Sequence, residues 1–422
     1  MQQITSRALA HMEPHAPARS SIVYEWLISR WLTRLPAGRI TIGFPSGGRM
    51  VFEGKAPGPQ AVLNIRSFRV LRRLLVSSDL GLAESFLQGE WDTPDLTGLL
   101  AFGMANDDFL SSNIKPPKAM NMLNRFRHRR NANTRVGSRR NIAAHYDLGN
   151  DFYRRWLDET MTYSSALFES LDEPMALAQQ RKYQRLAQSL DLHRDDRILE
   201  IGCGWGGFAE IAARQYGCEL VCLTLSVEQA GYARQRMAQA GLADKVEIRV
   251  QDYRDITETF DKIVSIEMFE AVGEAYWPTF FDVLQARLSP GGRAAMQIIT
   301  VDDDAFDHYR NNPDFIQRYI FPGGMLPSPR RFRQALSGRG LRLREEYFFG
   351  RSYAETLRRW DRAFQDNWPK IKALGFDGRF YRMWRYYLAY CEVGFDYGQI
   401  DVGHFLIERD KPRNAPYSQD SV

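Results

Sequence analysis

A glycine-rich junction between a predicted strand and a predicted helix constrains this chain more than any other feature. It reads E-I-G-C-G-W-G-G and runs from Glu200 to Gly207. Residues 197–199 before it are typical of a buried parallel strand, and residues 208–214 after it have the apolar spacing of a helix. Glycines let the backbone turn tightly and leave room for a ligand beside the peptide groups. The junction therefore predicts an α/β fold with a nucleotide-sized cofactor at the end of a strand.

Two neighbouring features bear on which cofactor this is. The junction also fits G-x-G-x-x-G, the dinucleotide fingerprint, through Gly202, Gly204 and Gly207. A dinucleotide site needs an acidic residue at the end of the second strand. The second predicted strand, 219–223, is followed by Thr224, and Glu228 belongs to the next predicted helix. Glu200, just before the first glycine, instead offers a carboxylate to the cationic amino group of S-adenosylmethionine. The pattern favours S-adenosylmethionine over NAD.

Alternating strand and helix patterns from residue 145 onward predict a doubly wound, Rossmann-like sheet. The expected strands lie at 196–201, 219–223, 246–250, 262–266 and 293–299, with later ones at 341–348 and 403–408. Ligands of such sheets bind outside the carboxyl ends of the strands. We therefore expect Glu200, Thr224, Asp252 and residues 267–270 to gather there.

The first part of the chain has a different pattern, which predicts a small α+β domain over residues 1–112. A hairpin with strands at 40–44 and 50–52 is expected, then a strand at 61–65 and helices near 68–76, 80–88 and 96–104. An apolar stripe over 22–35 fits either a helix packed on its own domain or one lying at a membrane interface.

A basic stretch follows, and it predicts a linker over residues 113–140. Between Lys115 and Arg140 there are nine Lys or Arg residues and no acidic residue. Such a run is usually a solvated face, but beside a lipid substrate it can bind an anionic membrane surface at about 1 kcal/mol per basic residue. Nucleic acid is not an expected partner, because Phe126 is the only aromatic residue of the run. Beyond the enzyme domain expected at 141–410, residues 411–422 are predicted to be a flexible tail.

Composition and hydropathy bear on the location of the protein and on whether it binds a metal. No segment reaches the roughly 18 uninterrupted apolar residues of a spanning helix, and the N-terminus lacks the apolar region of a signal peptide. The four cysteines, at 203, 218, 222 and 391, show no metal-ligand spacing. We therefore expect a cytoplasmic protein without a metal site, and the net charge of +5 mildly favours an anionic partner.

Ordered motifs over residues 140–410 resemble those of the cyclopropane-fatty-acyl-phospholipid synthase family. They are H-Y-D-L-G-N-D from His145, Y-S-S from Tyr163, the Glu200 loop, L-T-L-S with Gln229, Q-D-Y-R from Gln251, I-E-M-F-E from Ile266, F-P-G-G-M-L-P-S from Phe321, Tyr353 and Cys391. The resemblance implies methyl transfer from S-adenosylmethionine to a cis double bond of an unsaturated phospholipid, which forms a cyclopropane ring. It also implies peripheral association with the inner face of the membrane, and we expect phospholipid or homodimer contacts in the N-terminal domain.

The resemblance further implies a set of cofactor-lining residues, with Tyr253 against the adenine. The set is Tyr163, Ser164, Glu200, Gly202, Gly204, Thr224, Leu225, Gln229, Asp252, Tyr253 and Ile266.

For ring closure the resemblance implies a bound bicarbonate as the base, held by a glutamate, a histidine, a tyrosine and the backbone near a cysteine. In this chain the glutamate maps to Glu270 and the tyrosine to Tyr353, while the cysteine position is Ser165 and the histidine position is Gln297. Cys391 is a further expected catalytic residue. Gln297 can donate a hydrogen bond but cannot become cationic. A methyl-branched or methyl-olefinic chain is therefore the alternative product.

Other interpretations share parts of this pattern. The aromatic residues after Arg351 fit a core helix pair or the wall of an acyl tunnel equally well. A small-molecule methyltransferase would need a polar pocket and would have no use for the N-terminal domain. A lipid-binding scaffold with a decayed enzyme domain is opposed by intact Glu200, Gly202, Glu270 and Tyr353.

Overall fold

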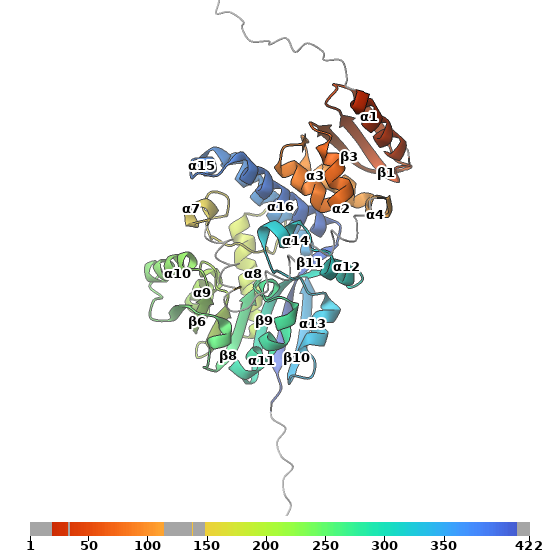
Figure 1. Cartoon of the computed structure of the whole chain (residues 1–422). Coiled ribbons are helices and arrows are strands. Elements are labelled where there is room, and N and C mark those ends of the chain that lie inside the picture. Colours follow the sequence, from red (N-terminus) through yellow and green to blue (C-terminus); the bar gives the residue numbers. More distant parts are fainter. Residues whose placement is uncertain (1–18, 33, 114–136, 138–147, 412–422) are drawn as a thin grey trace, which may run out of the picture. The chain divides into compact units, whose positions relative to one another are not determined.

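The computed structural model describes residues 19–32, 34–113, 137 and 148–411 (Figure 1). It divides the chain into two compact units, Met1–Pro116 and Pro117–Val422. Most of the predicted linker at 113–140 and of the predicted tail at 411–422 lies outside the described residues, as do the first three residues of the motif at His145. Among the described helices, none combines the length and the apolar character needed to cross a membrane.

The N-terminal unit is built on a four-stranded sheet in the order β2-β1-β3-β4. Its strands are β1 (Ala37–Gly43), β2 (Arg49–Glu53), β3 (Ala56–Ile65) and β4 (Trp91–Asp92), and its helices are α1 (Arg19–Leu32), α2 (Arg69–Leu87), α3 (Leu96–Ala105) and α4 (Asp107–Asn113). The hairpin and third strand are confirmed. The helices expected at 68–76 and 80–88 form one element, α2, with a kink at Ser78, whose φ of 48° is left-handed. In α1, Ile28 is buried, whereas Trp26 is 55% exposed.

The C-terminal unit is built on a seven-stranded sheet in the order β10-β11-β9-β8-β5-β6-β7. Its strands are β5 (Arg197–Ile201), β6 (Glu219–Thr224), β7 (Val246–Val250), β8 (Phe260–Ile266), β9 (Leu288–Val301), β10 (Leu341–Phe348) and β11 (Ile400–Arg409). All the expected strands are present, and the predicted fold class is confirmed. β5 to β9 run parallel, but β11 is antiparallel to both β9 and β10, so the sheet is mixed.

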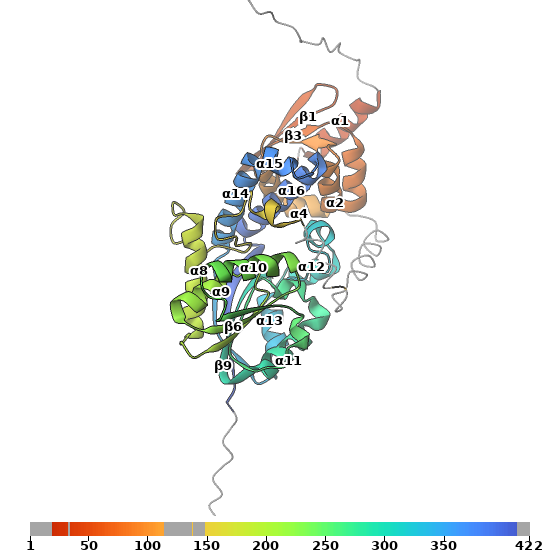
Figure 2. The ribbon, with the colours of Figure 1, turned by 90° about the vertical axis from the view of Figure 1, so that its left-hand side faces the viewer.

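Helices cover both faces of this sheet (Figures 1 and 2). One core contains side chains of α8 (Met175–Leu190), α9 (Gly207–Ile211) and α10 (Val227–Gln239), and the other contains side chains of α11 (Trp277–Arg287) and α13 (Pro329–Leu336). On β5, Ile198 belongs to the first core and Leu199 to the second. Successive strand side chains point to opposite faces, so Glu200 faces α8, α9 and α10.

Two long helices after β10, α14 (Gly350–Asp366) and α16 (Gly378–Asp396), carry many of the C-terminal aromatic residues. Trp360 of α14 and Trp384 of α16 are both buried. Their rings lie 5.5 and 5.7 Å from that of Trp156, and Trp384 also lies 5.0 Å from Phe152 of the short helix α7 (Asn150–Tyr153). These aromatic residues therefore form a packed core, as the first of the two interpretations expected.

Candidate functional site

The glycine-rich junction forms an open loop between β5 and α9. Gly202, Gly204 and Gly206 have φ values of 86°, 51° and 82°, a region that favours glycine. The backbone N–H groups of Gly202 and Cys203 each donate a 2.9 Å hydrogen bond to the carbonyl of Leu223, which ties the loop to β6. A Cβ added at Gly204 would have no heavy atom within 4 Å apart from those of Gly204 and its two chain neighbours. The loop therefore leaves space beside its backbone, as a bound cofactor requires.

Glu200 places a buried carboxylate beside this loop. Its Oε2 accepts a hydrogen bond from the Cys222 thiol at 3.4 Å, and no Lys or Arg of the described residues forms an ion pair with it. Burial raises the pKa of Glu200 to about 8, and this effect outweighs the opposing effects of the Cys222 hydrogen bond and the Arg236 charge. A ligand with an ammonium group would supply the missing cation, so the environment of Glu200 fits S-adenosylmethionine.

The end of β6 holds three of the predicted cofactor residues together. The Thr224 hydroxyl donates a 2.9 Å hydrogen bond to Oε1 of Gln229, and it accepts one from the N–H of Ser226 at 3.1 Å. Ser226 caps α10 by accepting a hydrogen bond from the N–H of Gln229. Leu225 lies between these residues and is half-buried.

Asp252, Tyr253 and Ile266 follow or end the neighbouring strands β7 and β8. Both carboxylate oxygens of Asp252 accept hydrogen bonds from Arg254, at 2.8 and 2.6 Å. The Tyr253 ring lies 5.4 Å from Phe280, and burial raises the pKa of Tyr253 to about 12. Ile266 packs at the edge of the core on the α8 face. Contact of Tyr253 with adenine stays a prediction.

Tyr163 and Ser164 lie on the segment that precedes α8. The Tyr163 hydroxyl is hydrogen-bonded to the Tyr387 hydroxyl at 2.8 Å, and its ring lies 5.3 Å from Trp360. Ser164 is buried and accepts a hydrogen bond from Lys182. Both residues are therefore held by partners from helices distant in sequence.

A half-buried carboxylate, Glu267, is the centre of a group of predicted catalytic residues. Its Oε1 accepts hydrogen bonds from the backbone N–H of Ser165 at 2.8 Å and from Nε2 of Gln297 at 2.7 Å. Its Oε2 accepts a hydrogen bond from the Tyr353 hydroxyl at 2.6 Å. The groups expected to surround a bicarbonate thus converge on one side chain of the protein.

Glu270, the glutamate assigned by motif, does not make these contacts. Its Oε1 accepts the backbone N–H of Ile299 at 2.6 Å, and its Oε2 is buried without a hydrogen-bond partner among the described residues. Burial, and then the neighbouring Glu267, raise the pKa of Glu270 to about 8. The I-E-M-F-E motif contains two glutamates, and matching by motif selects the second. Sequence reasoning therefore placed Glu267 at this end of the sheet but missed its contacts with Ser165, Gln297 and Tyr353.

The backbone at Glu267 is strained. Its φ of 49° lies in the left-handed region, which costs a residue with a side chain about 1–3 kcal/mol. The N–H of Glu267 donates a 2.9 Å hydrogen bond to the carbonyl of Gln297, which holds this conformation next to β9. Burial raises the pKa of Glu267, whereas the Tyr353 hydrogen bond and the Lys182 charge lower it. Such strain is concentrated at functional sites.

Lys182 of α8 is a buried cation that sequence reasoning also missed. It is 0% exposed, and its Nζ donates a 2.6 Å hydrogen bond to Oγ of Ser164. No carboxylate of the described residues lies within 4.0 Å of this Nζ. Burial lowers the pKa of Lys182, against the favourable charges of Glu267 and Asp158. The Q-Q-R-K stretch reads as a polar helix face, so only the fold shows that Lys182 points inward.

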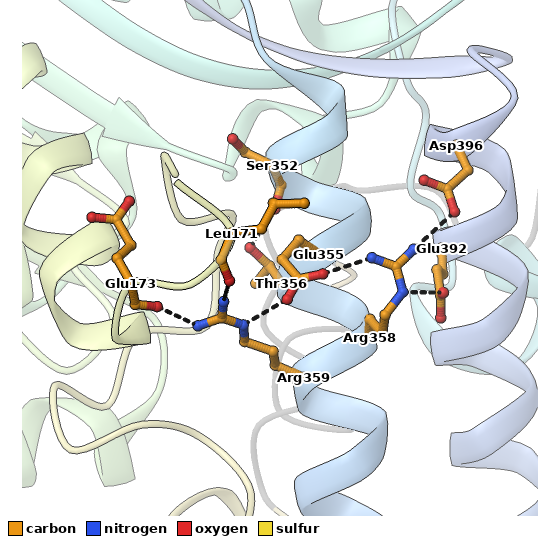
Figure 3. Close-up of polar contacts among 9 residues, drawn as sticks. All are labelled: Leu171, Glu173, Ser352, Glu355, Thr356, Arg358, Arg359, Glu392 and Asp396. Carbon is orange, nitrogen blue, oxygen red and sulfur yellow. Dashed lines mark hydrogen bonds and ion pairs between the residues drawn. The ribbon is translucent and has the colours of Figure 1, made fainter. Parts of the chain in front are cut away.

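Helix α14, which carries Tyr353, is braced by arginines on both sides (Figure 3). Arg359 donates to the main-chain carbonyls of Leu171 and Glu173 and to the carboxylate of Glu355. On the other side Arg358 donates to Glu355 and to two carboxylates of α16, those of Glu392 and Asp396.

The same helix also binds the segment that contains Ser165. Oγ1 of Thr356 accepts the backbone N–H of Ala166 at 3.1 Å, and Oγ of Ser352 accepts that of Phe168 at 3.1 Å. These bonds fix the N–H of Ser165 and the hydroxyl of Tyr353 relative to each other. The geometry around Glu267 is therefore built by α14, β9 and this segment together.

Cys391 and His404 complete the residues around the site. Cys391 is a free cysteine of α16, and burial raises the pKa of its thiol, which stays protonated. The structure shows no hydrogen bond between Cys391 and Glu267 among the described contacts, so a catalytic role for Cys391 stays a prediction. His404 of β11 lies 2.9 Å from Oε1 of Gln297 through its Nε2. Nothing in the motifs pointed to His404.

This chain is similar to known proteins over most of its length. A family model described as mycolic acid cyclopropane synthetase matches residues 133–405. The chain is 37% identical over 414 residues to a tuberculostearic acid methyltransferase of Mycobacterium tuberculosis, which covers 94% of each chain. It is 34% identical over 377 residues to the cyclopropane-fatty-acyl-phospholipid synthase of Escherichia coli, covering 88% of this chain and 93% of the relative. A crystal structure of a mycolic acid cyclopropane synthase complexed with SAH and CTAB is 32% identical, with a TM-score of 0.61, and covers 64% of this chain and 98% of the other.

Proposed function

Because the chain belongs to the mycolic acid cyclopropane synthetase family, we propose that it transfers the methyl group of S-adenosylmethionine to a cis double bond of an unsaturated phospholipid acyl chain. Relatives named for a fatty-acid methyltransferase and for a phospholipid cyclopropane synthase support this substrate class. The observation that carries the proposal is the convergence of Ser165, Gln297 and Tyr353 on the Glu267 carboxylate.

The residues at the ends of β5 and β6 fit S-adenosylmethionine. When bound, this cofactor supplies an electrophilic methyl group on a sulfonium sulfur. Glu200 would bind its ammonium group as a carboxylate, and Gly204 would leave room for it beside the loop backbone. The other expected contacts are Tyr163, Ser164, Gly202, Thr224, Leu225, Gln229, Asp252, Tyr253 and Ile266.

The first step depends on positioning and on a dry site. An alkene is a weak nucleophile, so holding it in line with the methyl group supplies much of the acceleration. The π electrons of the alkene form the new bond to the methyl carbon, the methyl–sulfur bond breaks, and the acyl chain becomes a carbocation. The anionic carboxylate of Glu267 and the ring of Tyr353 stabilise positive charge nearby. Tyr353 is buried and Glu267 is half-buried, which limits the capture of the cation by water.

Glu267 then acts as the base. Three groups that the family resemblance assigned to a bicarbonate donate hydrogen bonds to this carboxylate, so no separate anion is needed at that place. A C–H bond of the transferred methyl group breaks, its proton moves to Glu267, and its electron pair closes the three-membered ring. The products of this step are a cyclopropane and a neutral glutamic acid.

A methyl-olefinic chain is a second candidate product. In this alternative a C–H bond next to the cationic carbon breaks and its proton moves to the same carboxylate. The electron pair of that bond forms a C=C bond in place of the ring. The relative that covers 94% of this chain is named for a methyl transfer rather than for a cyclopropane, which favours this product. Conversion to a saturated methyl-branched chain would further require hydride from a separate reductant.

Isotope labelling distinguishes the products. The protein is incubated with S-adenosylmethionine carrying a CD₃ group and with vesicles of a cis-monounsaturated phospholipid, and the released fatty acids are analysed by mass spectrometry before and after hydrogenation. A cyclopropane retains two deuteriums and resists mild hydrogenation, whereas a methyl-olefinic chain takes up hydrogen. Saturated phospholipid vesicles serve as the control. Unaltered acyl chains, with S-adenosylmethionine shown to bind, would refute the proposed function.

A further inference from the structure

His404 lies directly opposite Gln297 across the antiparallel strands β11 and β9. Its Nε2 is 2.9 Å from Oε1 of the glutamine, and both side chains are buried, at 5% and 0% exposure. An amide oxygen can only accept, so the imidazole must carry its proton on Nε2. A histidine therefore stands one strand away from the position where the family resemblance expected one.

The other ring nitrogen of His404 has no partner among the described residues that could fix a different tautomer. Nδ1 must then be an unprotonated acceptor, and it has no hydrogen-bond partner among the described residues. Burial, followed by the charges of Arg185 and Lys182 on α8, lowers the pKa of His404 to about 3. The ring is thus neutral at neutral pH, and its single N–H is directed at Gln297.

The contact determines which end of the Gln297 amide meets Glu267. With Oε1 facing His404, the amide nitrogen Nε2 lies 2.7 Å from Oε1 of Glu267 and donates to it. A reversed amide would direct its oxygen at the carboxylate and its NH₂ group at the N–H of the histidine. Both contacts would then be repulsive. The His404 N–H therefore favours the orientation in which Gln297 donates to the carboxylate, together with the carbonyl of Ser165, which accepts from Nε2 of Gln297 at 3.4 Å.

We propose that His404 is a positioning residue, which orients the Gln297 amide and thereby keeps Glu267 in the anionic form that accepts a proton. This inference rests on the proposed role of Glu267 as the base. Other groups face Glu267 from neighbouring elements: Lys182 and Tyr353 favour the anion, and the carboxylate of Glu270 disfavours it. The effect of His404 on Glu267 is therefore measured as a shift in the pH dependence of kcat/KM.

The kinetic test uses the full-length variant His404→Phe, with His404→Gln as the conservative variant that keeps an N–H donor. The exposed His193→Phe is the matched control. We expect His404→Phe to shift the acidic limb of the kcat/KM profile upward by about one pH unit, which is about tenfold in rate on that limb. His404→Gln should restore most of the shift, and the affinity for S-adenosylmethionine should stay within about twofold in all variants. An unshifted acidic limb in folded His404→Phe would overturn the inference.

A second measurement does not depend on turnover. Nitrogen NMR of protein labelled with ¹⁵N-histidine should show His404 as a neutral ring protonated on Nε2, and this signal should change in Gln297→Leu. A ring protonated on Nδ1, or a cationic ring at pH 7, would contradict the inference even if the enzyme is active. Conversely, full activity of Glu267→Gln together with an Nε2-protonated His404 would refute the proposed base and leave the orientation of the amide intact.

Discussion

The hydroxyl of Tyr353 donates a 2.6 Å hydrogen bond to Oε2 of Glu267, and the two residues are 86 positions apart in the chain. Tyr353 comes from α14, and Glu267 comes directly after β8. Tyr353 is buried and Glu267 is half-buried, so competition with water for this bond is limited. Charge-assisted bonds of this kind are roughly twice as strong as neutral ones.

Removing the proposed base should stop turnover and leave cofactor binding intact. Glu267→Gln keeps the shape of the side chain but cannot take a proton, so we expect kcat to fall about 10²–10⁴-fold. The affinity for S-adenosylmethionine, measured by calorimetry, should hardly change. Glu270→Gln is the matched control, because the carboxylate of Glu270 forms a hydrogen bond only with the backbone N–H of Ile299 in the described structure, and this variant should lose far less activity. Equal losses in the two variants would contradict the assignment.

Tyr353→Phe should make the reaction more sensitive to acid. The variant removes one donor from Glu267, so the pKa of that carboxyl rises and the anion is present only at higher pH. A hydrogen bond to a charged group contributes about 1.5–3 kcal/mol, which corresponds to a loss of about 10- to 100-fold in kcat near neutral pH. Initial rates between pH 6 and 9 measure this shift. Tyr397→Phe, on a residue that is 44% exposed, is the control and should leave the profile unchanged.

Binding of S-adenosylmethionine should release a proton. Burial raises the pKa of Glu200 to about 8, so the residue is protonated in the free protein at pH 7 and must ionise to bind an ammonium group. The affinity should therefore increase about tenfold per pH unit below pH 8. Calorimetry in buffers of different ionisation enthalpy would count the proton. Glu200→Gln should bind more weakly and without this pH dependence, and an affinity that is flat between pH 6 and 7.5 in the unaltered protein would count against the ammonium contact.

The same residue gives a prediction for stability in the absence of cofactor. The pKa of Glu200 is higher in the folded than in the unfolded chain, so its protonated form stabilises the fold fully below an unfolded pKa of about 4.3. This contribution is lost as the pH rises to about 8. Relative to the unaltered protein, Glu200→Gln should gain stability between those limits, which chemical denaturation at pH 5 and pH 8 would reveal.

Lys182→Met should stabilise the protein and lower its activity on the acidic side of the pH profile. Burial lowers the pKa of Lys182, so the lysine costs stability as the pH falls from the ordinary lysine pKa of about 10.4 toward its folded value. The methionine removes this cost, and the melting temperature should rise most at neutral and acidic pH. Because the Lys182 charge also lowers the pKa of Glu267, the acidic limb of the rate profile should move upward. The exposed Lys372→Met is the control for both measurements.

The sequence predicts the sheet well because its strands are short apolar runs bounded by turns, and the burial of β5, β6 and β8 agrees with that pattern. Local signals also succeed, since Ser226 caps α10 as its residue type and position indicate. The contacts of Glu267, Lys182 and His404 could not be predicted in the same way. Each is set by partners more than ten positions away, as in the bond that joins residues 107 positions apart between β9 and β11. A motif identifies the segment that carries the proposed base, but only the fold shows which of its two glutamates is hydrogen-bonded to Tyr353.

The left-handed backbone at Glu267 has a consequence for how this site can change. Glycine is the residue that adopts a φ of 49° at least cost, so Glu267→Gly would relax the chain at that point. It would leave the donors of Ser165, Gln297 and Tyr353 around a space shaped for a small planar anion. One nucleotide separates the codons for glutamate and glycine. A single point mutation would thus replace a side-chain base by an anion that binds from solution. The reaction would then depend on the concentration of that anion.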